Sequence, residues 1–303
     1  MSTKISWADK SWNPIVGCSK ISAGCANCYA ERQAIRLRGM GQEQYSNVVW
    51  PKHFEGAENK KGWNGKTIFV ESALTKPLHW RKPRKIFVCS MSDLFHESVP
   101  FEWIDRVFAV MALCPQHEFK VLTKRAGRQL EYMTEPKADA RDCYNGIVKP
   151  EVQFRVHKRA LGMVHERQQT DKPNYNMWNG IWPLLNVHLG VTVENQDNVG
   201  RIAELIRTPA AKRFVSLEPL LGEIAVNPEL LLEITYAFIG AESKVPAKGK
   251  PGHRPLCTLE NIDELIGQCQ DVGVSVHVKQ IPLNGKCNKN FDEWPPEFQV
   301  REV

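Results

Sequence analysis

The chain has 303 residues, of which 42% are hydrophobic and 24% are charged, and its formal net charge is +6. This composition predicts a soluble globular protein. No apolar run approaches the roughly 20 residues that cross a bilayer, and the first residues lack the apolar core of a signal peptide. We therefore expect a cytoplasmic protein with no membrane contact and a mild attraction to polyanions.

The first distinctive feature in chain order is a short loop that carries Cys18, Cys25 and Cys28. A short strand is predicted before it at Lys4–Trp7, and the strong helix formers of Ala30–Arg38 predict a helix directly after it. Three thiolates at a junction between a loop and a helix are typical of a metal site.

From Lys66 onward, short runs rich in Val, Ile and Phe alternate with helical segments, as in repeated β-α units. Several runs are apolar at successive positions, which indicates parallel strands covered on both faces. The predicted strands are Thr67–Glu71, Ile86–Cys89, Phe119–Leu122, His188–Val193, Arg213–Leu217, Tyr236–Ile239 and Val274–Val278, and the predicted helices are Phe101–Leu113, Asn198–Ile206 and Leu259–Val272. We expect an α/β fold over residues 1–303, a complete or partial TIM-like β/α barrel rather than a doubly wound sheet.

Polar or charged residues follow most of the predicted strands, at the end of the strands that builds the active site in barrel enzymes. Glu194, Glu218 and Glu242 stand at equal intervals, as successive β-α units would place them. This repetition predicts a shared polar mouth, although strand ends that are simply solvated would also be polar. The segments are Ser90–Asp93, Thr123–Arg125, Glu194–Gln196, Glu218–Pro219, Glu242–Ser243 and Lys279–Gln280.

Two basic segments stand apart from this rhythm. The polar segment Thr134–Trp182 is predicted to be an insertion, either a lid that contacts substrate or an inert excursion. In Lys76–Lys85, cations are interleaved with an aromatic residue, which suits phosphate contact and base stacking, although a charged loop before a strand has the same composition. The candidate nucleic-acid-binding residues in this stretch are His79, Trp80, Arg81, Lys82, Arg84 and Lys85.

The nine cysteines show no disulfide framework. Cys89 and Cys114 lie in apolar segments and are expected to be buried, whereas Cys287 lies in a polar stretch and is a candidate fourth ligand or reactive thiol. Zinc needs a fourth ligand, but no histidine lies near the loop in sequence and no second Cys-x-x-Cys is present. The remaining interpretation is a 4Fe–4S cluster with one open iron, which binds and reduces S-adenosylmethionine.

The three-cysteine loop resembles that of the radical S-adenosylmethionine superfamily, with two departures: the cysteines are spaced six and then two residues, and Tyr29 follows the third cysteine. Seven motifs along nearly the whole chain also resemble a phage- and prophage-encoded, three-cysteine, radical-SAM-like family. They are Trp12–Cys18, Cys25–Glu31, Ser90–His96, Val121–Arg125, Gly190–Gln196, Arg213–Gly222 and Lys279–Gln280, and Gly240-Ala241-Glu242-Ser243 stands where that family has Gly-Gly-Glu-Ser.

The resemblance implies a role for each group of residues, with a structural ion pair as the alternative in each case. Cys18, Cys25 and Cys28 would ligate the cluster. The methionine part of S-adenosylmethionine would be bound at its amino group by Ser90, Ser92 and Asp93, with Glu71 as runner-up, and at its carboxylate by Lys124 or Arg125. Glu194 and Asn195 would suit ribose hydroxyls, and Glu218, Glu242 and Lys279 would face the substrate, with Lys279 or a nearby thiol donating a hydrogen or a proton.

The sequence therefore predicts a radical S-adenosylmethionine enzyme of a barrel type that acts on a nucleic-acid base, as a DNA modification or a lesion repair. It implies DNA as a partner and an electron donor such as flavodoxin or ferredoxin. One rival is the same chemistry on a small molecule or a protein, and another is a non-enzymatic zinc-binding phage adaptor.

Overall fold

The computed structural model describes residues 5–51, 61–135, 151–168, 181–243 and 257–303. The chain forms two compact units, each built from several segments. The first unit holds residues 1–19, 30–188 and 208–211, and the second holds residues 20–29, 189–207 and 212–303. The single domain expected over residues 1–303 stays a prediction, and each unit is described by itself.

In the first unit, parallel strands form the centre. Strand β4 pairs with β1 on one side and with β5 on the other, with Phe87 of β4 opposite Lys120 of β5. A small antiparallel pair, β2 and β3, joins Ile15 to Phe69. The strands are β1 (Lys10–Trp12), β2 (Ile15–Val16), β3 (Ile68–Phe69), β4 (Lys85–Val88) and β5 (Glu118–Thr123). The helices are α1 (Tyr29–Gly39, whose first residue belongs to the second unit), α2 (Glu71–Leu74), α3 (Phe101–Ala112), α4 (Ala126–Thr134) and α5 (Glu151–Gln168), with short 3₁₀ turns at Glu43–Tyr45 and Lys76–His79.

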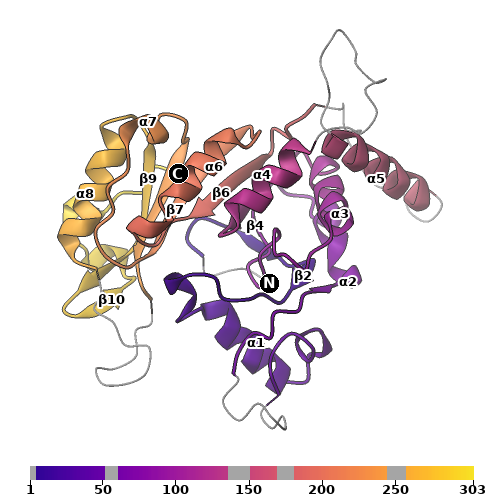
Figure 1. Cartoon of the computed structure of the whole chain (residues 1–303), viewed down its shortest axis with the longest axis horizontal. Helices are drawn as coiled ribbons and strands as arrows, with labels where there is room; N and C mark the ends of the chain where they lie inside the picture. Colours follow the sequence, from indigo (N-terminus) through magenta and orange to yellow (C-terminus); the bar gives the residue numbers. More distant parts are fainter. Residues whose placement is uncertain (1–4, 52–60, 136–150, 169–180, 244–256) are drawn as a thin grey trace. The chain divides into compact units, whose positions relative to one another are not determined.

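In the second unit, β8 lies between β7 and β9 and is parallel to both, while β10 turns back and pairs with β9 in the antiparallel direction. Helix α8 packs on β8 and β9 (Figure 1). The strands are β6 (Val187–Thr192, within this unit from Leu189), β7 (Lys212–Leu220), β8 (Tyr236–Ala241), β9 (Ser275–Leu283) and β10 (Lys286–Asn288). The helices are α6 (Gly200–Arg207), α7 (Pro228–Leu231) and α8 (Leu259–Gln270), with 3₁₀ turns at Ala23–Cys25, Gln196–Asn198, Phe291–Glu293 and Pro296–Phe298.

The strand order is β1-β4-β5-β6-β7-β8-β9-β10, so strands that follow one another through a helix are neighbours in the sheet. The fold is therefore a mixed α/β fold with a mostly parallel sheet, as the sequence predicted. This order is compatible with a partial β/α barrel. Every residue of β6 and of β8 is buried, as parallel strands with both faces covered require.

One predicted strand is wrong, and another is confirmed only in part. Residues Ile5–Trp7, the described part of Lys4–Trp7, form a turn, and the first strand is Lys10–Trp12. The pairing of this strand with β4 begins where the Asp9 carboxylate accepts the backbone N–H of Lys85 at 2.8 Å. The apolar pattern of the sequence did not indicate this contact. The run Thr67–Glu71 supplies only Ile68–Phe69, outside the main sheet, because Glu71 already begins helix α2.

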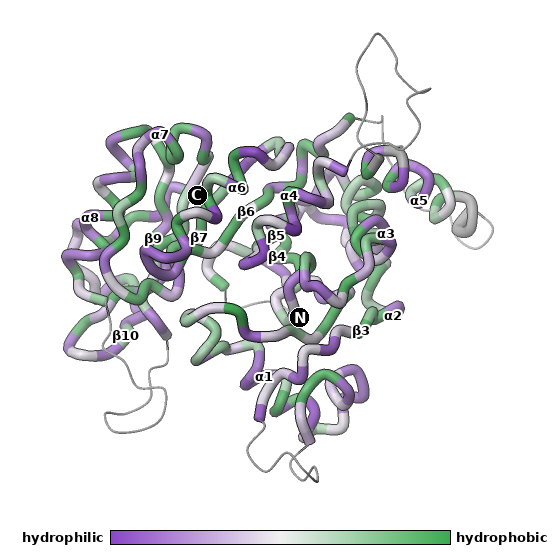
Figure 2. The backbone as a smooth tube through the Cα atoms, viewed as in Figure 1, coloured by the Kyte–Doolittle hydropathy of each residue, from purple (hydrophilic) through white to green (hydrophobic). Residues whose placement is uncertain are grey.

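The segment predicted to be an insertion contains helix α5, while residues 136–150 and 169–180 lie outside the described part of the chain. Helix α5 lies beside α3 (Figure 1), with Ala160 packed against Ala109 and Leu113. Figure 2 shows that much of α3 is hydrophobic, as expected of a helix covered on more than one face. None of the described helices is long and apolar enough to cross a membrane.

Candidate functional site: the cysteine loop and its anchors

The residue before Cys18 is Gly17, which lies at the carboxyl end of β4 in a position that only glycine can occupy. Gly17 donates its backbone N–H to the carbonyl of Met91 at 3.1 Å and bridges to Ser92, just beyond β4. Its φ is +99°, and an added Cβ would lie 2.2 Å from the carbonyl oxygen of Lys66. Glycine therefore sets the path by which the chain delivers Cys18 to the end of this strand.

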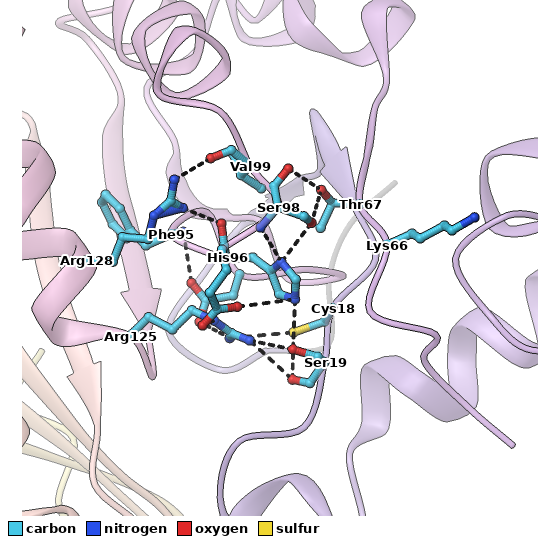
Figure 3. A network of polar contacts seen from close by, with 12 residues as sticks. Cys18, Ser19, Lys66, Thr67, Phe95, His96, Ser98, Val99, Arg125 and Arg128 are labelled. Carbon is cyan, nitrogen blue, oxygen red and sulfur yellow. Dashed lines mark hydrogen bonds and ion pairs between the residues drawn. The ribbon is translucent and has the colours of Figure 1, made fainter. Parts of the chain in front are cut away.

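Arg125 lies beside Cys18 and joins several groups of the first unit (Figure 3). Its Nη1 is 3.9 Å from Sγ of Cys18 and 3.1 Å from Oδ2 of Asp93, and its Nε donates to Glu97 at 2.8 Å. Arg125 is only 7% exposed, so burial opposes its charge, but Asp93, Glu97 and the Cys18 sulfur more than offset this effect and raise the guanidinium pKa. A buried guanidinium at this distance stabilises negative charge on the sulfur.

Both carboxylate oxygens of Asp93 accept hydrogen bonds from residues of the first unit. One carboxylate oxygen accepts the Thr123 hydroxyl at 2.7 Å and the Phe95 N–H at 3.0 Å, and the other accepts Arg125 and the backbone N–H of Lys124. Asp93 and Arg125, predicted to bind opposite ends of a bound methionine, are buried and pair with each other at 3.1 Å, and their roles toward a methionine stay predictions.

Ser19 is positioned by Arg125 and His96. The backbone N–H of Ser98 donates to Nδ1 of His96, so that atom is an acceptor and the ring proton lies on Nε2. Nε2 then donates to the Ser19 hydroxyl at 2.9 Å, and Nη2 of Arg125 donates to the same oxygen at 2.8 Å (Figure 3). Burial and the charge of Arg125 lower the His96 pKa, which keeps the imidazole neutral.

Cys25 and Cys28 belong to the second unit, in a loop held by two carboxylates. The Gly24 N–H lies 3.4 Å from Oε1 of Glu194, and the Asn27 amide donates to Oε1 of Glu242 at 3.1 Å. Glu194 follows β6 and Glu242 follows β8, and both side chains are buried. The segment with Cys25 and Cys28 therefore lies at the carboxyl ends of these strands, and both glutamates act as its anchors.

Glu218 and Lys279 form a second polar group in this unit. Both lie within their strands, β7 and β9, which extend beyond the predicted ends. Nζ of Lys279 is 2.5 Å from Oε1 of Glu218, and Nε2 of Gln280 is 3.3 Å from the same oxygen. The Glu218 and Lys279 side chains are 16% and 23% exposed, so this ion pair is accessible to a ligand.

The chain matches the family model described as "Protein of unknown function (DUF5131)" over residues 2–291. It belongs to this family. The match covers the cysteine loop and all strands of the sheet. No curated protein and no solved structure matches the chain.

In this member of the DUF5131 family, most of the remaining predicted cofactor residues have structural partners. Ser90 donates to Asn13 at 3.2 Å and Ser92 donates to the carbonyl of Ile15 at 2.9 Å. The runner-up Glu71 forms a two-point ion pair with Arg106, which lowers its carboxyl pKa. Asn195 donates to Asp197 at 3.0 Å, at the turn before α6. Lys124 is half-buried beside this network.

The basic stretch Lys76–Lys85 lies at the opposite end of β4 from Cys18, because Lys85 is the first residue of that strand. Lys76, His79, Arg81, Lys82, Pro83 and Lys85 are exposed, whereas Arg84 is half-buried. Trp80 is also half-buried, with its ring 6.0 Å from that of His117. The stretch does not border the loop that carries Cys18.

Sequence reasoning assigned no role to Ser19, Asn27 or His96. His96 and Asp93 were visible in the motif Ser90–His96, but their partners come from distant segments. The pairing of Asn27 with Glu242 spans 215 residues, and no local pattern encodes it.

None of the eight described cysteines forms a disulfide. Cys89 and Cys114 are buried, which confirms that prediction, and burial raises the pKa of the Cys89 thiol to about 12. Within the described residues, no group of three or more His, Cys, Asp or Glu side chains is arranged to hold a metal ion.

Cys18, Cys25 and Cys28 are each half-buried, so they are reachable and are not core residues. Cysteine thiols that are reachable and not tied up in disulfides are the ligands that iron–sulfur clusters take. Burial raises the pKa of the Cys287 thiol, which disfavours the thiolate that a fourth ligand must supply.

Proposed function

We propose that the chain is a radical S-adenosylmethionine enzyme whose 4Fe–4S cluster is held by Cys18, Cys25 and Cys28, and that it acts on a nucleic-acid base. The observation that carries this proposal is the anchoring of the loop. Arg125 lies beside Cys18 at the end of β4, and Glu194 and Glu242 hold the segment with Cys25 and Cys28 at the ends of β6 and β8. In β/α enzymes this end of the strands carries the chemistry.

When bound, a cluster with one open iron supplies the electron that cleaves S-adenosylmethionine reductively. The chain itself positions the ligands and compensates their charge. Arg125 places a positive charge 3.9 Å from Sγ of Cys18, which offsets the negative charge of a ligating thiolate. Ser19, held by Arg125 and His96, fixes the backbone next to Cys18.

The substrate side is assigned to the ion pair of Glu218 and Lys279, because both side chains are partly exposed. Lys279 would donate a proton to the substrate, and Glu218 would hold the ammonium group in place. The neighbouring Gln280 is buried, and its Nε2 donates to Oε1 of Glu218 at 3.3 Å, which helps to hold the carboxylate in place. Glu242, predicted to face the substrate, is assigned to the loop instead, since it accepts Asn27.

The proposed setting is the cytoplasm, where thiols stay reduced, with flavodoxin or ferredoxin as the electron donor. The proposed reaction is a DNA modification or a lesion repair. Its support is the basic stretch Lys76–Lys85, whose cations are mostly exposed.

Anaerobic reconstitution with iron and sulfide tests the cluster. We expect about four irons per chain, and 5′-deoxyadenosine after reduction with S-adenosylmethionine. Cys18→Ala, Cys25→Ala and Cys28→Ala should each lose most of the iron. Cys287→Ala is the matched control, because Cys287 is also half-buried but lies outside the loop, and it should keep its iron.

Full iron and activity in Cys18→Ala would overturn the proposal. Stoichiometric zinc from an anaerobic preparation, without cleavage of S-adenosylmethionine, would identify a zinc-binding adaptor instead.

A further inference from the structure

Two segments of the first unit carry the excess positive charge of the chain. The basic stretch Lys76–Lys85 contains five Lys or Arg residues and no acidic residue. Residues 151–164 of α5 contain Arg155, Lys158 and Arg159 and a single acidic residue. Together these segments exceed the net charge of +6 of the whole chain, so the remainder is close to neutral.

The fold brings these segments together although more than 60 residues separate them. Leu78 of the basic stretch packs against the cluster that Ala109 of α3 and Leu113, just after that helix, form with Ala160 of α5. Met163 and Val164 of α5 pack against the same cluster. A helix with its side chains is only about 10 Å wide. The cations of the basic stretch and those of α5 therefore lie close enough together for one extended polyanion to contact both.

The basic stretch is held in place by neutral contacts that leave its charges available. His117 donates from Nε2 to the carbonyl of Pro77 at 3.2 Å, and its ring lies 6.0 Å from that of Trp80. Arg81 and Lys82 remain exposed. A fixed backbone with exposed cations is suited to phosphate contact, because little ordering entropy is lost on binding.

On α5, the cations differ in their availability. Arg155 forms ion pairs with Asp105 and Glu135, so its charge is already compensated. Lys158 and Arg159 are exposed, although Arg159 also lies close enough to lower the Asp105 pKa. The available charges of the surface are therefore those of Arg81, Lys82, Lys158 and Arg159, together with Lys76. Lys85 is also exposed, but it lies close enough to Glu118 to lower the pKa of that carboxyl.

This surface lies at the opposite end of β4 from Cys18, within the same unit. Lys85 begins β4, whereas Gly17 bridges to Ser92 beyond the other end of that strand. The four residues of β4 alone separate the two places by about 10 Å. At about 3.4 Å per phosphate along one strand, a nucleic acid that reaches both places spans about three nucleotides or more.

We propose that Lys76–Lys85 and α5 form one anchoring surface for the phosphate backbone of a nucleic acid, apart from the place where its base reacts. This inference rests on the proposed function, whose substrate class it specifies. It differs from the prediction made for the basic stretch alone, because α5 supplies part of the contact and Trp80 is a packing residue. The surface recognises charge and not sequence, since its exposed groups are cations.

A lipid surface is the competing polyanion, and the apolar exposure argues against it. Interfacial helices bury a broad apolar face in the membrane in addition to their charge. Among the described residues of these two segments, Leu161 is the one large hydrophobic side chain that is mainly exposed. The surface thus has the charge that phosphates require without the apolar face that lipids require.

The test measures the affinity of the full chain for a fluorescent duplex of about 20 base pairs over a series of salt concentrations. The variants are Arg81→Gln/Lys82→Gln on the basic stretch and Lys158→Gln/Arg159→Gln on α5. The matched control is Arg207→Gln/Lys212→Gln, which removes one Arg and one Lys, both exposed, from the second unit. The single variant Lys158→Gln is also measured, because replacing Arg159, which lies near Asp105, can change the stability of the fold.

Each test pair should weaken binding about ten- to a hundredfold and lower the salt slope by about two, while the control pair leaves both nearly unchanged. Iron content should be equal in all variants. Test pairs that bind DNA like the control would overturn the inference, as would loss of binding to phosphatidylserine vesicles but not to DNA. If the protein held iron and cleaved S-adenosylmethionine but bound no DNA, the proposed anchoring surface would be wrong, while the proposed cluster would be retained.

Discussion

The guanidinium of Arg125 and the carboxylate of Asp93 lie 3.1 Å apart, and both side chains are buried. The same guanidinium contacts Glu97, whose side chain is 63% exposed. One arginine thus joins a buried partner and an exposed one, and the two contacts have different energetic weights. A buried charge without its partner is costly, whereas exposed ion pairs contribute little.

Arg125→Met should therefore lower the free energy of unfolding by about 3 kcal/mol or more, because Asp93 remains buried without its counter-charge. Glu97→Gln is the matched control and should change it by less than about 1 kcal/mol. Urea denaturation of both variants measures the difference. Equal losses would show that the buried pair does not dominate the stability of this region.

Loss of the Glu194 anchor should loosen the loop that carries Cys25 and Cys28. In Glu194→Ala, Gly24 loses its acceptor and Arg201 loses the carboxylate that lies 2.8 Å away. We expect several-fold faster tryptic cleavage after the exposed Lys20, together with a loss of about 3 kcal/mol in unfolding free energy.

Glu194→Gln should restore most of the resistance to trypsin, since its amide oxygen still accepts from Gly24. The exposed Glu223 provides the control variant Glu223→Ala, which should be cleaved like the native protein. If Glu194→Ala also resisted cleavage, the carboxylate would not be an anchor.

Gly190 should not tolerate a side chain. A Cβ at this position of β6 would lie 2.5 Å from the ring of Phe214, which stacks on Tyr236 at 5.2 Å. Gly190→Ala should cost about 1–3 kcal/mol of unfolding free energy through overpacking. Gly267→Ala, in α8 with no atom within 4 Å of the added Cβ, should instead gain up to about 1 kcal/mol. Thermal and urea denaturation compare the two, and an equal response would contradict the predicted clash.

Acid should destabilise the region around His117. Burial lowers the His117 pKa from its ordinary 6.5, so the unfolded chain binds a proton at a higher pH than the folded chain. The stability that depends on the neutral ring is fully present above pH 6.5 and is lost as the pH falls through and below that value. Denaturation at pH 7.5 and at pH 5.5 measures this loss.

In His117→Gln, the side-chain amide can still donate to Pro77 but does not titrate. The variant should therefore lose less stability between the two pH values than the native protein. An identical pH dependence would assign the effect to other groups, such as His96, whose pKa is also lowered.

The strands were predictable wherever burial on both faces leaves a continuous apolar run. The predicted Tyr236–Ile239 became Tyr236–Ala241, and the predicted helix Phe101–Leu113 became Phe101–Ala112. Lys10–Trp12 was missed because a three-residue strand contains too little apolar periodicity to stand out. Thr67–Glu71 has the composition of a strand, but propensity does not reveal which partner is present.

The sequence by itself determined the α/β class, the three clustered cysteines and the polar groups near the ends of successive strands, because these depend on local composition and spacing. Only the tertiary structure decided which polar groups form ion pairs or hydrogen bonds with one another. Asp93 pairs with Arg125, and Glu194 and Glu242 hold the segment that carries Cys25 and Cys28. A carboxylate and a cation in a sequence have many potential partners, and their roles follow from the distances and burial that folding imposes.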